Sequence, residues 1–299
     1  MTLKPILLVL TSSVLHAAWN YLAKKSGDKL SFLFAVKTTS LVILTPVILF
    51  YLTGSAAIRE GLANYRLLVV LALASGLIHS LYNFFLSRAY EYGDISVSYP
   101  IARGMAPFLV ALFSFFFLGE TPSSAGISGM ALIALGIFLL VKSRPPQEME
   151  VEGREEVSYF NLKNPVLFAI LTAIMISLYV SFDGLGSRNF TPLSFMYFYS
   201  FVSIIFLSIP ISRSPGVLFR ELRENKGAIF AGGVMMPLSY LLALHAMRLS
   251  QLGYVASLRN VSVVFAAFLG FLWLDEPFTP FRLGGSAIVF LGALFLGFG

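Results

Sequence analysis

The sequence has no cysteine and few charged residues. Only 12% of its 299 residues are Asp, Glu, Lys or Arg, whereas a soluble domain carries about 25%. The lack of cysteine excludes a disulfide framework and thiolate metal sites. Three scattered histidines, without HExxH or DxD spacing, give no ligand set for a metal-dependent enzyme. A Walker A motif is missing too, so this chain does not draw its energy from ATP.

Apolar residues are abundant instead, at 57% of the chain. The net charge of +6 then indicates loops that face anionic lipid, because no basic cluster interleaved with aromatic residues suggests a nucleic-acid site. We therefore predict an all-α integral membrane protein, multi-pass, in a prokaryotic plasma membrane. Membrane lipid and a small-molecule substrate are the expected partners, with no nucleic acid and no metal or other cofactor.

Ten stretches are long and apolar enough to cross a bilayer, which takes roughly 20 residues per helix. They lie near 4–22, 32–52, 66–87, 95–118 and 124–142, and near 165–183, 193–212, 227–247, 251–274 and 281–298. The polar segment 143–164 separates them into a first half, 1–142, and a second half, 165–299. We expect the first stretch to be a span and not a signal peptide, because it has a counterpart in the second half.

The two halves match each other. Glu276 lies 156 residues after Glu120, and the same offset aligns Arg103 with Arg259, Gly129 with Gly285, and Gly136 with Gly292. Five spans is an odd number, so the second copy must enter the membrane upside down. The sequence thus predicts ten transmembrane helices in two inverted five-helix repeats, an arrangement typical of secondary transporters.

Each predicted fourth helix ends in a similar corner, LGETP (118–122) or LDEP (274–277), before a glycine-rich last helix. In these features nearly the whole chain resembles the EamA family of the drug/metabolite transporter superfamily. The segment 16–32 also resembles a subgroup found beside phosphonate-utilisation genes. The resemblance implies a monomeric or homodimeric carrier with a central cavity, and a range of substrate classes. Small multidrug relatives bind cations with a glutamate in the first helix, which this chain lacks.

Two arginines lie inside predicted spans. A central arginine costs about 2.5–3.5 kcal/mol to insert, so Arg103 and Arg259 need compensation. One interpretation is a pair of cations that bind substrate carboxylate or phosphate, with Tyr99 four residues before Arg103 and Asn260 directly after Arg259. The other is structural ion pairs, or side chains that extend to the headgroups.

Asp183, at the end of the span 165–183, is the one acid clearly near a span interior. It is predicted to have a gating or coupling role, pairing with an arginine in one state of the carrier. Lys37 either shares that role or extends to the interface. The positive balance of these groups favours an anionic or zwitterionic substrate.

Two prolines interrupt the span 95–118. Pro107 removes the hydrogen bond to the carbonyl of Arg103, and Pro100 removes the bond to that of Ser96. We predict a bend with a gating role, or alternatively a packing kink.

Polar residues also recur at helical spacing. Ser12, His16 and Asn20 share one face with Trp19 beside them; Ser75, His79 and Asn83 share another; Tyr179 and Asp183 share a third. We predict that His16, Trp19, Asn20, His79, Asn83 and Tyr179 contact substrate. Hydrogen bonds between helices are the alternative, and His16 and His79 are also candidates for proton coupling.

These features together predict a secondary active transporter that works by alternating access. Its predicted substrate is a small anionic or zwitterionic metabolite, such as an amino acid, organic acid, organophosphate or phosphonate. The alternatives are an exporter of other metabolites or drugs, and an intramembrane enzyme acting on lipid-linked phosphates.

Overall fold

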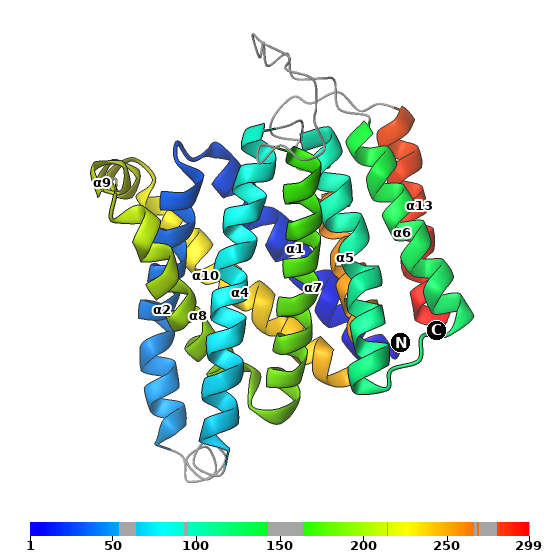
Figure 1. Ribbon diagram of the computed structural model, residues 1–299, viewed down its shortest axis with the longest axis horizontal. Coiled ribbons are helices and arrows are strands. Elements are labelled where there is room, and N and C mark those ends of the chain that lie inside the picture. The colour runs from blue at the N-terminus through cyan, green and yellow to red at the C-terminus, as the bar shows by residue number, and fades with distance from the viewer. Residues whose placement is uncertain are drawn as a thin grey trace. The chain divides into compact units, whose positions relative to one another are not determined.

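The computed structural model describes residues 1–53, 64–92, 95–142, 164–213, 215–265, 268 and 280–298. These residues confirm the all-α prediction, since they form helices and contain no strand. The helices are α1 (Leu3–Lys25), α2 (Lys29–Leu52), α4 (Tyr65–Tyr92), α5 (Ile95–Leu118), α6 (Ser124–Lys142), α7 (Pro165–Asn189), α8 (Pro192–Ile211), α9 (Pro215–Glu224), α10 (Lys226–Leu249), α11 (Leu252–Arg259) and α13 (Pro280–Phe298) (Figure 1).

Within the described residues, 7 helices are long and apolar enough to cross a membrane: α1, α2, α4, α5, α7, α8 and α10. Three further apolar stretches are shorter, Ser124–Leu139, Leu252–Phe265 and Leu283–Leu296. The count of ten spans therefore stays a prediction. The polar segment 143–163 and the LDEP corner lie outside the described residues.

One predicted boundary is wrong. The span 165–183 was expected to end at Asp183, but α7 continues to Asn189. The sequence Gly-Leu-Gly-Ser-Arg-Asn after Asp183 looks like a helix end because of its glycines, yet Gly186 is needed for packing. A Cβ there would lie 2.3 Å from the ring of Phe195. Asp183 is consequently an interior residue of its helix.

The chain forms two compact units. The first unit contains Met1, Leu81–Val180 and Gln251–Gly299, and the second contains Thr2–Ser80 and Ser181–Ser250. Each unit therefore combines segments from both halves of the sequence. The boundaries fall inside α4 and α7, so both helices contribute residues to both units.

Glycines hold α6 against α13 in the first unit, where Figure 1 shows the two helices side by side. A Cβ on Gly129 would lie 2.8 Å from the carbonyl oxygen of Gly292, and one on Gly136 would lie 2.7 Å from that of Gly285. The low-numbered glycine of one helix meets the high-numbered glycine of the other, so the helices run antiparallel. Small residues permit such close backbone contact.

The LGE corner ends α5 and caps α11 within the same unit. Gly119 has φ +66°, a left-handed conformation that glycine adopts without strain. The amide of Glu120 donates to the carbonyl of Ser114 at 3.1 Å, which closes the helix end. The Glu120 side chain accepts the amide of Leu252 at 2.9 Å, at the first turn of α11.

In the second unit, α10 packs against α1 and α2. Ser12 and Ser239 donate their hydroxyls to each other's backbone carbonyls at 2.7 and 2.8 Å, a reciprocal contact between α1 and α10. Between α2 and α10, Phe32, Val36 and Ile229 form an apolar core. These contacts satisfy the polar groups of one helix pair and bury the apolar groups of the other.

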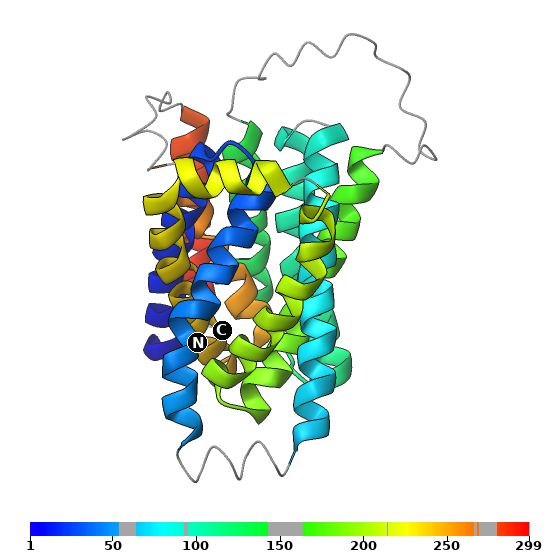
Figure 2. The same ribbon diagram turned by 90° about the vertical axis from the view of Figure 1, so that its left-hand side faces the viewer.

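The short helix α9 was not predicted from the sequence. Its 10 residues are too few to cross a bilayer, and Figure 2 shows it lying across one end of α2. Phe219 is exposed, whereas Glu221 is buried and accepts the backbone amide of Asp28 at 3.1 Å. An amphipathic helix of this kind is typical of the membrane surface.

The glycine contact between α6 and α13 can be tested by adding one methyl group. Gly292→Ala places a Cβ 2.7 Å from the carbonyl of Gly129, so we expect a loss of about 1–3 kcal/mol from overpacking. Gly284→Ala on the same helix meets nothing within 4 Å and is the matched control. Thermal unfolding in detergent should show a lower midpoint for Gly292→Ala alone. Equal midpoints for the two variants would contradict the contact.

Candidate functional site

A buried carboxylate organises the polar groups of the second unit. Asp183 on α7 is fully buried and accepts hydrogen bonds from the hydroxyls of Ser75 on α4 and Tyr240 on α10. The Nε2 of His79 lies 2.9 Å from the second oxygen of the same carboxylate. Burial of an ionised acid is costly unless donors surround it. Three donors from two neighbouring helices provide that compensation.

Aromatic rings fix the imidazole of His79. The ring of Tyr199 on α8 stacks on it with centroids 4.8 Å apart, and Tyr240 meets it edge-on at 5.8 Å. Ser75 and His79 are four residues apart on α4, so both side chains reach Asp183 from one helix face. This spacing was visible in the sequence. Tyr199 and Tyr240 were missed, although a phenol in an apolar span is the signal that could have found them.

Lys37 does not extend to the membrane interface, and that alternative is wrong. Its side chain is buried, and its amine donates to the hydroxyl of Ser203 on α8 at 2.8 Å. The hydroxyl of Ser80 on α4 donates to the backbone carbonyl of Ser203 at 3.3 Å. A lysine two turns into a helix is held inside by these groups.

The polar residues of α1 are partly engaged with one another. The amide of Asn20 donates to the carbonyl of His16 at 2.6 Å, and the His16 ring meets Trp19 edge-on at 5.2 Å. The indole Nε1 of Trp19 is buried and has no hydrogen-bond partner in the part of the chain that the structure describes. Of these three, Trp19 thus keeps a donor available for a ligand.

In the first unit, Arg103 on α5 is half-buried and lies beside Tyr82. Its guanidinium lies 3.5 Å from the hydroxyl of Tyr82 on α4. The ring of Tyr82 in turn packs edge-on against that of Tyr179 on α7, with centroids 5.5 Å apart. Two predicted binding residues, Arg103 and Tyr179, therefore both contact Tyr82.

The carbonyl that Pro107 leaves without a helical partner finds one on another helix. The side-chain amide of Asn260 donates to the carbonyl of Arg103 at 3.0 Å. Asn260 is buried and directly follows Arg259, the last residue of α11. The bond brings the backbones at the two arginines into neighbouring positions. Asn260 was predicted to bind substrate, and here its side chain donates to a backbone carbonyl of α5.

The helix α11 ends after 8 residues, at Arg259. The next turns follow a tighter pattern, in which Val261 bonds Leu258 at 3.1 Å and Val263 bonds Asn260 at 3.0 Å. A turn at residues 260 and 261 thus interrupts the helix, which resumes over 262–265. The buried hydroxyl of Ser257, just before it, has no hydrogen-bond partner among the described residues.

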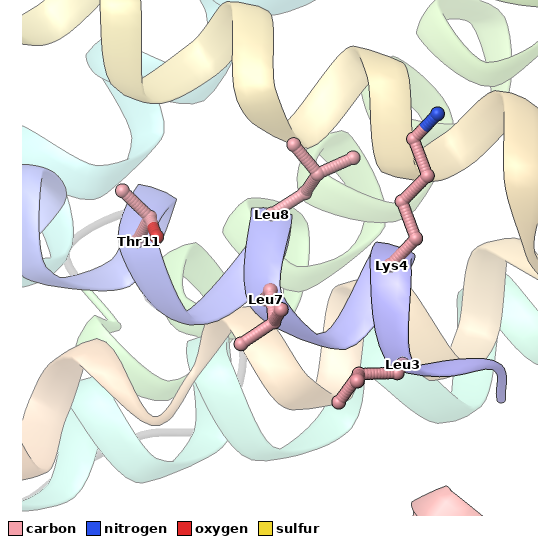
Figure 3. A pocket seen from close by; sticks show the side chains of 5 residues that line it. All are labelled: Leu3, Lys4, Leu7, Leu8 and Thr11. Atoms are coloured by element: carbon pink, nitrogen blue, oxygen red, sulfur yellow. The ribbon is translucent and has the colours of Figure 1, made fainter.

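The remaining predicted residues are placed as follows. Asn83 is half-buried on α4, and Pro107 is buried on α5. The helix α5 runs on through Tyr99 and Pro100, whose side chains lie outside what the structure describes. An open pocket along α1 is lined by Leu3, Lys4, Leu7, Leu8 and Thr11 (Figure 3). These residues belong to an exposed face, and the predicted binding residues do not line this pocket.

Comparison with known proteins now adds to this geometry. The EamA-like transporter family matches residues 3–142 and 163–298 of the chain. The chain belongs to this family. It is accordingly a multi-pass protein of the cell membrane and a transporter, and the alternative of an intramembrane enzyme is wrong.

The functions of two relatives of this EamA protein are known from their names. Both are named pseudopaline exporter CntI, from the UCBPP-PA14 and PAO1 strains of Pseudomonas aeruginosa. They are 26% and 25% identical to the chain over 242 residues, which is 80% of this chain and 78% of theirs. A solved crystal structure, 17% identical, superposes with a TM-score of 0.70 over 99% of this chain and 96% of that one. It shows the fold alone.

The role of Asn260 can be tested with a double-mutant cycle. Asn260→Ala should cost about 1–3 kcal/mol, because the buried carbonyl of Arg103 loses its donor. In a Pro107→Ala background the new amide of residue 107 can bond that carbonyl, so Asn260→Ala should cost clearly less. The measurement is equilibrium unfolding in mixed micelles.

The matched control is Asn189→Ala. Asn189 is exposed and donates to the carbonyl of Leu185 within its own helix at 2.9 Å. Its loss should be small and equal in both backgrounds. An equal cost of Asn260→Ala with and without Pro107 would contradict the assigned role.

Proposed function

We propose that this EamA transporter is a secondary active carrier that works by alternating access. Its proposed substrate is a small anionic or zwitterionic metabolite, such as an amino acid, organic acid, organophosphate or phosphonate. The observation that carries the proposal is the bond from Asn260 to the carbonyl of Arg103, which draws the positions of Arg103 and Arg259 together.

Two guanidinium groups in apolar helices favour a ligand of opposite charge. Each is expensive to insert into a bilayer, and a substrate carboxylate or phosphate offsets part of that cost. The planar fork of arginine suits either group through two parallel hydrogen bonds. Tyr82 and Tyr179 add aromatic surface beside Arg103 for the apolar part of a substrate.

The end of α11 beside this pair supports the same location. Transporters bind substrate and ions at interrupted helices, where backbone groups are released from the helical ladder. The turn at residues 260 and 261, directly after Arg259, is such an interruption. The buried hydroxyl of Ser257 is one further polar group close to it along the chain.

Two observations support an inverted repeat with ten spans. The family matches the chain once in each half, over residues 3–142 and 163–298. In addition, Gly136 contacts Val289 while Gly292 contacts Ile133. The offset of 156 relates the two contacts, because it aligns Gly136 with Gly292 and Ile133 with Val289. A two-fold axis produces such reciprocal contacts.

Export is the proposed direction of transport. The two curated relatives are named exporters, and they align with four fifths of the chain. Pseudopaline, the cargo in their name, is a property of those proteins. The substrate class proposed for this chain rests on its own arginines.

Binding can be tested with thermal shifts of the purified protein. The panel contains an amino acid, an organophosphate, a phosphonate and a cationic drug. We expect stabilisation by at least one of the first three and none by the cation. Arg103→Gln and Arg259→Gln should each weaken the shift at least tenfold in ligand concentration. A loss of 1.4 kcal/mol in binding corresponds to that factor.

Arg223→Gln is the control, because Arg223 is an exposed residue of α9. It should bind and transport as the unaltered protein does, and all three variants should elute as folded monodisperse protein. Stabilisation by the cationic drug alone, or normal ligand binding by both arginine variants, would contradict the proposed substrate class.

A further inference from the structure

We propose that α9 (Pro215–Glu224) binds the anionic headgroups of membrane phospholipids. The proposal goes beyond the proposed transport function and stands independently of it, because it concerns the surface of the second unit. Two features of that unit carry the proposal. Contacts hold α9 in one orientation, and its outer side combines exposed apolar residues with an excess of positive charge.

The inner side of α9 is fixed by two residues, Leu218 and Glu221. Leu218 packs against the apolar core between α2 and α10. Glu221 is buried, and its carboxylate accepts the backbone amide of Asp28 at 3.1 Å and the side-chain amide of Asn225 at 2.7 Å. Asp28 and Asn225 directly precede the first residues of α2 and α10. These contacts tie α9 to the starts of both helices, which sets the side of α9 that faces outward.

The outer side of α9 is amphipathic. Phe219 is 70% exposed and Leu222 is 37% exposed. At 3.6 residues per turn, a spacing of three places these two residues on one side of the helix, whereas Arg220 and Glu224, which are both exposed, share the opposite side. An apolar stripe beside a charged stripe is the pattern of a helix that lies in the membrane interface.

Positive charge dominates this surface. Four cations are exposed between residues 213 and 226: Arg213, Arg220, Arg223 and Lys226. The same segment contains two acids, and because Glu221 is buried, Glu224 alone of the two is exposed. A cluster of four Lys and Arg residues on an amphipathic helix favours anionic lipid, whose phosphate accepts the paired N–H groups of arginine.

The same charge argues against a second copy of the chain as the occupant of this surface. A two-fold dimer through α9 would place two identical surfaces face to face. Four exposed cations on each copy would then repel one another across the contact. Lipid phosphates offer the opposite charge, and the exposed ring of Phe219 matches the acyl chains directly below them.

The position of α9 places it at the level of the headgroups. The candidate membrane spans of α2 and α10 are Lys29–Tyr51 and Lys226–Leu249. Both spans begin where α9 packs against their helices, and Figure 2 shows α9 lying across that end of α2. The apolar part of the bilayer therefore ends beside α9, and phospholipid headgroups begin there.

The first test titrates anionic lipid. The full-length protein is purified in phosphatidylcholine–detergent micelles, and its unfolding midpoint is followed as phosphatidylglycerol is added. We expect the midpoint to rise, and Arg213→Gln/Arg220→Gln should need about tenfold more phosphatidylglycerol for the same rise. The rise should also shrink in about 1 M salt, where the screening length is about 3 Å.

The matched control is Arg66→Gln/Arg248→Gln, which removes the same charge from exposed positions outside α9. It should respond to phosphatidylglycerol as the unaltered protein does. An equal loss of response in both double variants would overturn the proposal, since any surface cation would then suffice. Equal stabilisation by inorganic phosphate in solution would also overturn it, because the ligand would then not be a lipid.

Substrate binding should not follow the lipid response. The surface of α9 belongs to the second unit, whereas Arg103 and Arg259 belong to the first. Loss of one or two of the four cations should therefore leave the substrate affinity unchanged. If the panel compounds fail to bind but the phosphatidylglycerol response is present, the substrate class is wrong and the lipid surface stands.

The second test measures the depth of α9 in a bilayer. Because the chain has no cysteine, a single introduced cysteine takes a spin label at one position only. Phe219→Cys and Glu224→Cys are labelled and compared in vesicles that contain phosphatidylglycerol. The label at position 219 should collide mainly with oxygen, which dissolves in lipid, and the label at 224 mainly with a water-soluble nickel chelate.

Two outcomes of the labelling would contradict the proposal. Equal access of the nickel chelate to both positions would mean that α9 faces water and is free for a soluble partner. Spin–spin broadening at position 219 that grows with protein density in the vesicles would mean that a second copy of the chain covers α9.

Discussion

The structure depends on one constraint, that a polar group buried among apolar helices must find its partner within the protein. Asp183 draws donors from α4 and α10, and Lys37 reaches a serine of α8. The carbonyl of Arg103, freed by Pro107, takes the amide of Asn260. Each of these bonds joins two helices, so the polar residues help to determine which helices are neighbours.

Glycines bring the backbones of α6 and α13 into close contact. Where α6 and α13 meet, backbone oxygens lie within 2.8 Å of where a glycine Cβ would be, which leaves no room for a ligand. This pair is suited to be scaffold. The tyrosines, the arginines and the acid of the candidate site lie on other helices, α4, α5, α7, α8, α10 and α11. Close glycine contacts occur on these helices too, since a Cβ on Gly76 of α4 would lie 2.6 Å from Val202 and one on Gly253 of α11 would lie 2.9 Å from Ala111.

Much of the fold could be predicted, because apolar runs, glycines and prolines act locally. The bounds of α5 and α6 and the freed carbonyl at Arg103 followed from sequence. The partners did not, since a sequence shows that Lys37 needs compensation but not that Ser203 supplies it. The position of Asp183 was misjudged for a related reason: the glycines after it serve helix packing, which depends on Phe195, a residue of another helix.

The repeat contrasts with the group around Asp183. Arg103 and Arg259 are related by the offset of 156, so the proposed substrate grip is two-fold. The first helices of the halves align at an offset of 160, Pro5 over Pro165, which places Asp183 over Ala23, an uncharged residue. A symmetric grip can hold a substrate equally well in both states of a carrier. Coupling to an ion needs a group whose affinity for that ion differs between the two states of the carrier. Asp183 occurs in the second half alone, so no repeat symmetry makes its surroundings equivalent in those two states.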